Sequence, residues 1–397
     1  MKQICVLGLG YIGLPTSSIL AAKGYQVLGV DVSKKVVDTI NNGKIHISEP
    51  DLDLFVKAAV QSGKLRAALT PEPSEAFIIA VPTPFKEGKK PDLSYVEAAT
   101  RSIIEHLRPG NLVILESTSP PNTCNHVILP LLKQAGFTPG RDIYLAHCPE
   151  RVLPGQIMRE VVENQRVIGG YTPECAEKAQ ELYATFVKGA IHLTDSTTAE
   201  MVKLVENSFR DVNIAFANEL SLICDELKLN VWDLIRLANL HPRVNILRPG
   251  PGVGGHCIAV DPWFIVDACP QSARLIKTAR EVNDSKPEFV VKKVMQAAER
   301  FKNPVIGVFG LAYKPDIDDL RESPASDIAH KLKERQAGRL MVCEPYCSEH
   351  KDFDLYDLDT TLKQADILVL LVAHQQFKKI DRELLKPKIV IDTCGVW

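Results

Sequence analysis

The sequence of 397 residues lacks several features that would assign it to common classes of protein. No apolar run approaches the ~20 residues that a membrane-spanning helix needs, and no block of basic residues suggests a nucleic-acid partner. The net charge is −2 and the hydrophobic content is 45%, which are ordinary values for a soluble globular protein. An apolar run begins already at Ile4, so we expect no signal peptide, no membrane association and a cytoplasmic protein.

The ten cysteines lack the spacings that mark disulfide scaffolds or metal sites. No CxxC pair or zinc-finger pattern is present, and the four-residue spacing of Cys343 and Cys347 has no second pair to complete a metal site. Scattered cysteines of this kind favour reduced thiols in a cytoplasm. We therefore expect neither a disulfide framework nor a metal site.

A glycine-rich turn follows the first apolar run. Segment 8–13 fits the pattern GxGxxG between a predicted strand at 4–7 and a predicted helix at 14–22, and Asp31 ends the next strand. The first two glycines would leave space for a pyrophosphate at the helix N-terminus, and the third would allow close helix–strand packing. Asp31 would accept hydrogen bonds from the adenosine ribose and repel a 2′-phosphate, which favours NAD over NADP. The alternative is a doubly wound sheet without a cofactor.

Strands and helices alternate through the first half of the chain, which predicts a mostly parallel sheet. Pro82, Thr83 and Thr118 follow directly on the ends of two predicted strands, where ligands bind in open α/β sheets. The predicted strands after the first are 25–31, 76–81, 112–116, 143–146 and 166–169.

A stretch without Gly or Pro, 197–227, predicts one long helix. Lys203, Asn207 and Arg210 fall at i, i+4 and i+7 and share a face. Such a stripe is usually solvated, but the positions around it are apolar, so we expect the helix to be buried on more than one side. A buried Lys and Asn need polar partners, and a substrate oxygen would supply one. These apolar positions are Met201, Val202, Val205, Ile214 and Phe216.

The last third of the chain repeats the strand and glycine pattern after a second predicted helix at 286–300. Segment 310–314 lacks the dinucleotide fingerprint, so this part either binds a ligand other than a second NAD or is a purely structural copy. The predicted fold class is α/β, with two Rossmann-like doubly wound domains joined by a long central helix. The predicted domains are 1–195 (NAD-binding), 196–300 (helical, with the cysteine loop) and 301–397 (Rossmann-like). The predicted strands here are 304–310, 340–343, 367–372 and 388–392.

The segment 250–261 sets Cys257 in a glycine-rich turn with Asp261 four residues on. The cysteine is either an exposed nucleophile or a buried thiol in a tight turn. Beside an NAD site, a thiol indicates covalent aldehyde oxidation: the thiolate adds to the aldehyde, hydride leaves, and water cleaves the thioester. An ammonium such as Lys203 would stabilise the oxyanions, and Asp261 or Glu150 would steer protons or water. A zinc hydrolase is less consistent, because one turn does not supply a tetrahedral site.

Ordered motifs along the whole chain resemble those of the nucleotide-sugar 6-dehydrogenases, the UDP-glucose/GDP-mannose dehydrogenase superfamily. The resemblance implies oxidation of a sugar C6 alcohol to a carboxylate, with two NAD reduced per turnover and Cys257 as the covalent nucleophile. It also implies that the last domain binds the nucleotide diphosphate. The protein would be a homodimer in which domain 196–300 forms the interface, with the long helix at its core and Arg243 reaching across it. The motifs are 8–15, 81–84, 116–120, 148–155, 206–211, 254–257 with 261–262, 310–314 and 319–324.

The resemblance assigns a role to each motif residue. The implied catalytic residues are Cys257, Lys203, Asn207, Asp261, Glu150 and Thr118. The implied cofactor contacts are Gly8, Gly10, Tyr11, Ile12, Gly13, Asp31, Pro82, Thr83, Thr118 and Arg321. The implied substrate contacts are Arg151, Val152, Leu153, Lys203, Asn207, Arg210, Arg243, Asn245, Gly254 and Lys314.

Within that family the resemblance is greatest to the members that act on UDP-N-acetyl-D-mannosamine. It rests on the runs 210–224, 241–246 and 257–264. His256 and Val260 stand where the UDP-glucose enzymes usually carry other residues. The alternatives are the same chemistry on UDP-N-acetylglucosamine or UDP-glucose, or a nucleotide-sugar binding protein without catalysis.

Overall fold

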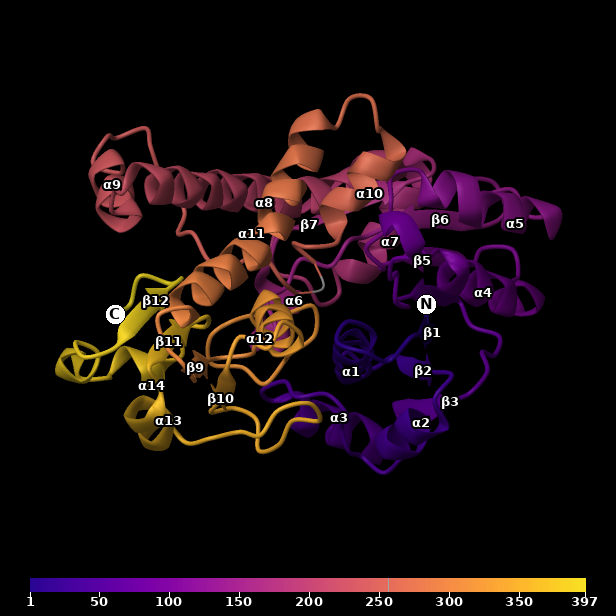
Figure 1. Cartoon of the computed structure of the whole chain (residues 1–397). Coiled ribbons are helices and arrows are strands. Elements are labelled where there is room, and N and C mark those ends of the chain that lie inside the picture. Colours follow the sequence, from indigo (N-terminus) through magenta and orange to yellow (C-terminus); the bar gives the residue numbers. More distant parts are fainter. Residues whose placement is uncertain (256) are drawn as a thin grey trace. The chain divides into compact units, whose positions relative to one another are not determined.

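The computed structural model describes residues 1–255 and 257–397; His256 lies outside the described residues. The chain divides into two compact units, Met1–Glu206 and Asn207–Trp397, which are described one at a time (Figure 1). None of the helices in the described ranges has both the length and the apolar content that crossing a membrane requires.

The first unit is built on an eight-stranded sheet with the order β3-β2-β1-β4-β5-β6-β7-β8. Neighbouring strands are parallel except β6 and β7, which pair antiparallel. The strand order reverses between β1 and β4, the position where open α/β sheets bind their ligands. The strands are β1 (Gln3–Leu7), β2 (Gln26–Val30), β3 (Leu65–Ala68), β4 (Ala76–Ile79), β5 (Leu112–Leu115), β6 (Tyr144–His147), β7 (Arg166–Gly170) and β8 (Ile191–Asp195).

Helices cover both faces of this sheet. Side chains of α1, α2, α3, α6 and α7 pack on one face, and those of α4, α5 and the π-helical turn η3 pack on the other. All residues of β4 and β5 are buried, as expected for parallel strands covered on both sides. The helices are α1 (Gly13–Ala22), α2 (Lys34–Asn41), α3 (Leu52–Gln61), α4 (Ser94–Ile103), η3 (Cys124–Ile128), α5 (Leu129–Gln134), α6 (Ile157–Glu163) and α7 (Pro173–Tyr183), with short 3-10 turns η1 (Glu87–Lys89) and η2 (Ile104–His106).

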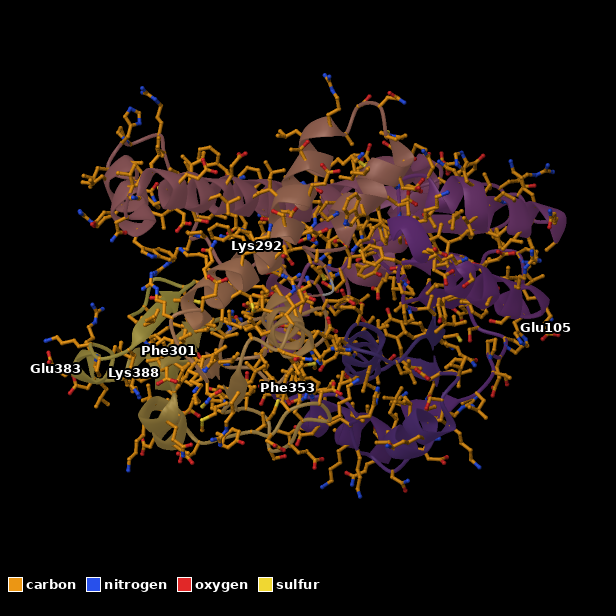
Figure 2. The ribbon with its side chains drawn as sticks, viewed as in Figure 1. Glu105, Lys292, Phe301, Phe353, Glu383 and Lys388 are labelled. Carbon is orange, nitrogen blue, oxygen red and sulfur yellow. The ribbon has the colours of Figure 1, made fainter. Side chains whose placement is uncertain are left out.

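The helix α8 (Ser196–Leu227) is continuous over 32 residues and runs across the division between the units. The rest of the second unit contains a four-stranded parallel sheet with the order β10-β9-β11-β12. Helices α11 and α12 pack on one face of this sheet, and α13, α14 and Trp397 pack on the other. Phe353, labelled in Figure 2, lies in the first of these cores and is 8% exposed.

The remaining elements of the second unit are α9 (Val231–Ala238), α10 (Asp261–Ala268), α11 (Arg274–Ala298), α12 (Pro324–Glu334), α13 (Leu358–Gln364), α14 (Gln375–Lys378), the 3-10 turn η4 (Arg382–Leu384), β9 (Val305–Phe309), β10 (Arg339–Cys343), β11 (Ile367–Leu370) and β12 (Ile389–Asp392).

The predicted fold class, two Rossmann-like doubly wound domains and a long helix, is confirmed. Two details of the sequence interpretation are wrong or incomplete. The second long helix begins at Arg274 instead of near Lys286. Pro287 is typical of a helix start, but here it is buried inside a helix that continues through it. The two edge strands, β3 (Leu65–Ala68) and β8 (Ile191–Asp195), were not predicted, since each combines a short length with polar or charged residues. The boundaries predicted at residues 195 and 300 stay a prediction.

Candidate active site

The glycine-rich turn after β1 has little room on one side and open space on the other. A Cβ atom on Gly8 would lie 2.4 Å from the carbonyl oxygen of Ala80, and one on Gly13 would lie 1.8 Å from that of Gly8. A Cβ atom on Gly10, in contrast, meets nothing within 4 Å. Gly8 and Gly13 are therefore required by close backbone approach, and Gly10 keeps the entrance to α1 clear for a ligand.

Asp31 lies at the carboxyl end of β2 and organises this turn. Its carboxylate accepts hydrogen bonds from the amides of Leu9 (3.1 Å) and Ser33 (2.9 Å). The side chain is half-buried, so oxygen lone pairs remain on the side of a bound ribose. No side chain caps the N-terminus of α1 among the residues described, which leaves its amides for a pyrophosphate. The turn and Asp31 together fit a dinucleotide.

The ends of β4 and β5 lie at the same edge of the sheet. Thr83 Oγ1 donates a 2.6 Å hydrogen bond to the carbonyl oxygen of Thr118, and Ser117 Oγ donates to the carbonyl oxygen of Val81 at 2.7 Å. The two predicted cofactor segments are thus joined to each other. Tyr11 and Pro82 are exposed, and Ile12 is half-buried.

A cluster of buried ionisable groups lies beneath that edge. Glu150 pairs with the Arg166 guanidinium at 2.7 Å, and both side chains are almost fully buried. Tyr183 donates a 2.5 Å hydrogen bond to Glu116. Burial, and then repulsion from Glu150, raise the pKa of Glu116 to about 7. Two acids thus share one cation, and a proton on Glu116 keeps the cluster neutral.

Arg166 and Glu116 were not predicted as functional residues. A signal for Arg166 exists in the sequence, because an arginine opens an otherwise apolar strand, and a buried arginine requires an acidic partner. The resemblance named Glu150 without the cation that balances it.

The segment after β6 carries three predicted substrate contacts. Arg151 donates to Glu206 at 2.7 Å and also to the carbonyl oxygen of Gln165. The amide of Leu153 donates to Glu160 at 2.7 Å, and Val152 packs against the sheet core. The segment is thus fixed by side chains on both sides of it.

In the second unit the cysteine loop leads directly into α10. Cys257 is exposed, in contrast to the alternative of a buried thiol. The amide of Asp261 donates to the carbonyl oxygen of Cys257 at 2.8 Å, which sets the two residues one turn apart. Asp261 is 2% exposed, and its carboxylate accepts a 2.5 Å hydrogen bond from Asn207 Nδ2. The carboxylate of the loop is therefore fixed to α8.

Close packing explains the glycines of this loop. A Cβ atom on Gly254 would lie 2.3 Å from the carbonyl oxygen of Glu322 and 2.6 Å from Pro324 Cδ. Gly255 has φ +86° and faces the Tyr313 ring, so a side chain would be strained there as well. Because glycine has no side chain, the loop can pack closely against the segment 313–324.

A buried polar network fixes the start of the same loop. Asn218 on α8 accepts a 2.8 Å hydrogen bond from the amide of Gly250 and donates to Asn283 on α11. Asn283 in turn donates to Asp211, which pairs with Arg280 at 2.6 Å. Both ends of the cysteine loop are thus tied to α8.

The polar stripe on α8 differs in part from the prediction. Lys203 is half-buried, Asn207 is buried, and Arg210 is exposed. The expectation that the helix is buried on more than one side is wrong for the single chain, because Val205 is 49% exposed and Phe216 is 51% exposed. An apolar residue can face outward on a long helix, and sequence periodicity does not show what covers it.

The other predicted substrate and cofactor contacts lie on exposed segments. Arg243 and Asn245 follow α9, Lys314 follows β9, and Arg321 donates to Asp319 at 2.9 Å. All four residues belong to the second unit, whereas the predicted cofactor edge of the sheet belongs to the first unit.

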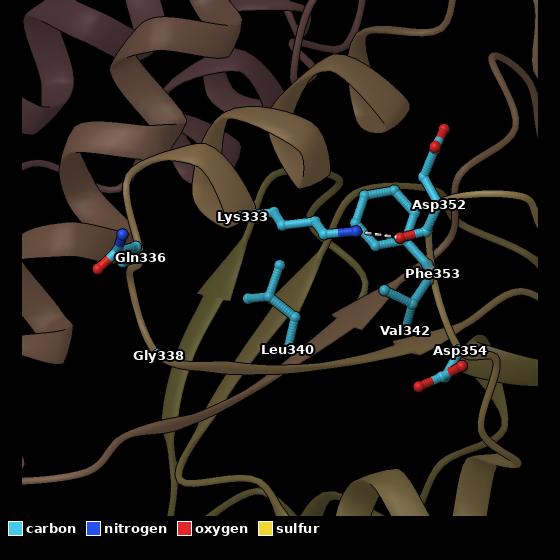
Figure 3. Close-up of a pocket in the computed structure, with 8 residues that line it drawn as sticks. All are labelled: Lys333, Gln336, Gly338, Leu340, Val342, Asp352, Phe353 and Asp354. Carbon is cyan, nitrogen blue, oxygen red and sulfur yellow. Dashed lines mark hydrogen bonds between the residues drawn. The ribbon is translucent and has the colours of Figure 1, made fainter.

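Two pockets of the second unit contain none of the predicted site residues. Figure 3 shows one of about 450 Å³, in which Lys333 crosses the Phe353 ring at 5.2 Å and donates to the carbonyl oxygen of Asp352. The other, of about 470 Å³, lies beside Lys286 and Asp392. We assign no role in catalysis to either.

An acidic residue follows a strand in the second sheet, as Asp31 does in the first, but it has different partners. Glu344 follows β10 as Asp31 follows β2, and it accepts a 2.6 Å hydrogen bond from the amide of Leu311. Glu344 is only 4% exposed and also contacts His374. Its carboxylate is used within the protein, which does not fit the binding of a second ribose as at Asp31.

Comparisons with known proteins agree with both halves of this description. Models of the UDP-glucose/GDP-mannose dehydrogenase family match in three consecutive parts: the NAD binding domain at residues 2–187, the central domain at 197–285 and the UDP binding domain at 307–397. The chain belongs to this family. It is an NAD-dependent nucleotide-sugar dehydrogenase, and the predicted cofactor and family are confirmed.

Individual relatives of this dehydrogenase match along the whole chain. It is 58% identical to a protein named NDP-N-acetyl-D-galactosaminuronic acid dehydrogenase from Ralstonia nicotianae, over 100% of this chain and 96% of that one. It is 54% identical to the UDP-N-acetyl-D-mannosamine dehydrogenase of Yersinia pestis, over 100% and 99%. A solved UDP-N-acetyl-mannosamine dehydrogenase from S. aureus is 46% identical, with a TM-score of 0.92 over 100% of this chain and 95% of that one.

The buried acid cluster gives a prediction about stability and pH. The pKa of Glu116 is about 7 in the folded protein, against 4.5 ordinarily, so its proton stabilises the fold fully below pH 4.5. That contribution, at most about 3 kcal/mol, is lost as the pH rises to 7. In Glu116→Gln the amide oxygen still accepts from Tyr183 but does not titrate. We expect Tm to fall between pH 5 and 8 more steeply in the native protein than in the variant.

Exposed Glu105→Gln is the control. Parallel Tm curves for Glu116→Gln and the native protein would contradict the assignment.

Asp31 gives a second prediction. Asp31→Asn keeps an acceptor for the Leu9 amide but removes the charge, so NAD binding should weaken about tenfold or more and the discrimination against NADP should fall. Fluorescence titration with NADH and NADPH measures both affinities. Asp38→Asn, an exposed acid on α2, should change neither. Unchanged NADH and NADPH affinities in Asp31→Asn would mean that the ribose is held elsewhere.

Proposed function

We propose that this enzyme oxidises the C6 hydroxyl of UDP-N-acetyl-D-mannosamine to the uronic acid, with two NAD reduced per turnover. The observation that supports the chemistry most directly is the exposed Cys257, one turn from a buried carboxylate that Asn207 fixes to α8. A thiol presented in this way, in a chain with an NAD-binding domain, favours covalent capture of an aldehyde.

The proposed chemistry gives each of these residues a task. The glycine-rich turn and Asp31 would hold NAD, which would supply a hydride acceptor for each of the two oxidations. The Cys257 thiolate adds to the C6 aldehyde to form a thiohemiacetal, whose oxidation leaves a thioester on the same sulfur. Water then cleaves the thioester, so that alcohol, water and two NAD⁺ yield carboxylate, two NADH and three protons.

Lys203 lies one helical turn before Asn207 on α8, on the same face. We propose that its ammonium stabilises the oxyanion of each tetrahedral species and that Asn207 orients the reacting oxygen. Asp261 and Glu150 are the proposed acids and bases for water and proton transfer, with Thr118 as a hydroxyl partner. Arg166 would hold Glu150 in place through their buried ion pair.

The choice of sugar rests on relatives. The proteins named for UDP-N-acetyl-D-mannosamine favour that substrate. The 58% identical relative favours an N-acetylgalactosamine nucleotide as the second candidate. UDP-N-acetylglucosamine and UDP-glucose are the remaining alternatives.

The experiment is NADH production by the purified enzyme on each of these four UDP-sugars. We expect two NADH per UDP-N-acetyl-D-mannosamine and little with the others. Cys257→Ser should form no acid while it still binds NADH, and Cys269→Ser, which alters another exposed thiol, should retain activity. Turnover on a different sugar would change the proposed substrate but would leave the proposed chemistry in place. NADH from none of them would favour a binding protein, and full turnover by Cys257→Ser would refute its role.

We further propose a homodimer in which α8 forms the core of the interface and Arg243 reaches the partner's substrate. Phe209, Phe216 and Ile223 recur at seven-residue intervals on α8 and are 67%, 51% and 44% exposed. An apolar seam of this period is typical of packing against another helix. Leu237 on α9 and Leu240 just after it are two further exposed apolar residues, 54% and 73% exposed.

Charge placed in this seam should separate the subunits. We expect Phe209→Glu with Phe216→Glu to convert a dimer into a monomer, because two carboxylates per chain would be buried without partners. Sedimentation velocity measures the mass. Leu275→Glu alters an equally exposed residue, 70% exposed and outside the seam, and should leave the mass unchanged. A monomeric native protein, or a variant that stays dimeric, would refute the seam.

A further inference from the structure

Three residues far apart in the sequence meet within the first unit. Cys124 begins the turn η3, His147 ends β6, and Glu200 lies in the first turns of α8. One ligand atom from each, a sulfur, an imidazole nitrogen and a carboxylate oxygen, lie within 4.8 Å of one another. Their exposed fractions are 0%, 0% and 1%. The cluster lies between the sheet and η3, at the carboxyl end of β6, and none of its members is among the residues assigned to the cofactor or to catalysis.

His147 is the unusual member of this cluster. Neither of its ring nitrogens has a hydrogen-bond partner among the residues that the structure describes. Burial lowers the pKa of His147 to about 3, so the ring is neutral and presents one lone pair. Each buried polar group without a partner costs about 1–3 kcal/mol. This buried imidazole, with a ring nitrogen within 4.8 Å of a thiol sulfur and a carboxylate oxygen, fits a ligand that would supply the missing partner.

Glu200 is held in a fixed orientation. Its two carboxylate oxygens accept hydrogen bonds from the amides of Asn122 (2.5 Å) and Cys124 (2.8 Å). These bonds fix the acid at the start of η3 and leave a further lone pair on each oxygen. Supporting contacts of this kind orient metal-ligating carboxylates.

We propose that Cys124, His147 and Glu200 bind a divalent transition-metal ion of the zinc class. The donor set of one sulfur, one nitrogen and one oxygen suits zinc, whereas magnesium and calcium prefer oxygen alone. A thiolate and a carboxylate would balance the two charges of the ion. Ligand atoms around tetrahedral zinc lie about 3.5 Å apart, so a pair at the 4.8 Å limit of this cluster needs to close by about 1.3 Å. Enclosure of the site gives the ion a structural task, that of joining α8 to η3 and β6.

The sequence predicted no metal site because these residues share no local spacing. The competing interpretation is a thiol hydrogen-bonded to the carboxylate. Burial, and then the Glu200 carboxylate, raise the pKa of the Cys124 thiol. That arrangement leaves the imidazole nitrogens without a partner, whereas a metal ion occupies one of them.

The test uses full-length protein that carries Cys257→Ser, so that the exposed thiol of the cysteine loop does not bind metal. Cys124→Ser, Glu200→Gln and the control Cys175→Ser are each added to this protein. Cys175 is a buried thiol of the same unit outside the cluster. Zinc per chain is measured by plasma mass spectrometry. Co²⁺ is then added to chelator-treated protein, and the thiolate-to-cobalt charge-transfer absorption is recorded.

We expect about one zinc per chain in the parent protein and in Cys175→Ser, with a cobalt–thiolate band in both. Cys124→Ser should lose that band, and both cluster variants should bind the ion at least about tenfold more weakly. Chelation should lower Tm of the parent protein, and zinc should restore it. Absence of zinc and of the cobalt band in the parent protein would overturn the proposal in favour of the thiol–carboxylate pair. Equal binding by Cys124→Ser would also overturn it. The parent protein is decisive even if a cluster variant does not fold, and none of these readouts depends on dehydrogenase activity.

Discussion

The hydrogen bond between Asn207 and Asp261 is the constraint on which the proposed chemistry depends. It is 2.5 Å long, both residues are buried, and it joins α8 to the first residue of α10. Asp261 in turn bonds to the backbone of Cys257, and Asn218 anchors the other end of the loop at Gly250. One long helix thereby positions the thiol loop at two points and also carries Lys203. A loop rich in glycine would otherwise lose much of its order to chain entropy.

The first unit buries charged side chains beneath the edge of the sheet that fits the cofactor. Two acids and one arginine lie in the core, and a proton on Glu116 makes the group neutral. Isolated burial of either carboxylate would be costly. The ion pair of Glu150 and Arg166 therefore explains how a proposed catalytic carboxylate is tolerated in the buried interior.

Local patterns predicted the parallel strands, the glycine turn and the long helix, because period, glycine spacing and strand-end acids are properties of neighbouring residues. The same reasoning missed Arg166 as the partner of Glu150 and the meeting of Cys124, His147 and Glu200, since these depend on tertiary contacts between distant segments. It also placed Val205 and Phe216 inside the fold, where an apolar residue on an exposed helix face gives the same pattern. The wrong start of α11 has a physical cause: packing of the buried Pro287 offsets the hydrogen bond that proline removes.

The most direct measurement of the central claim is mass analysis of the Cys257 peptide during the first turnover. Enzyme, UDP-N-acetyl-D-mannosamine and NAD would be mixed, quenched in acid within milliseconds to seconds, digested and sequenced by mass spectrometry. The account predicts a transient acyl adduct on Cys257, which adds to the peptide the mass of the uronic acid nucleotide minus one water. Formation of two NADH per sugar without any adduct on Cys257 at any time would contradict it.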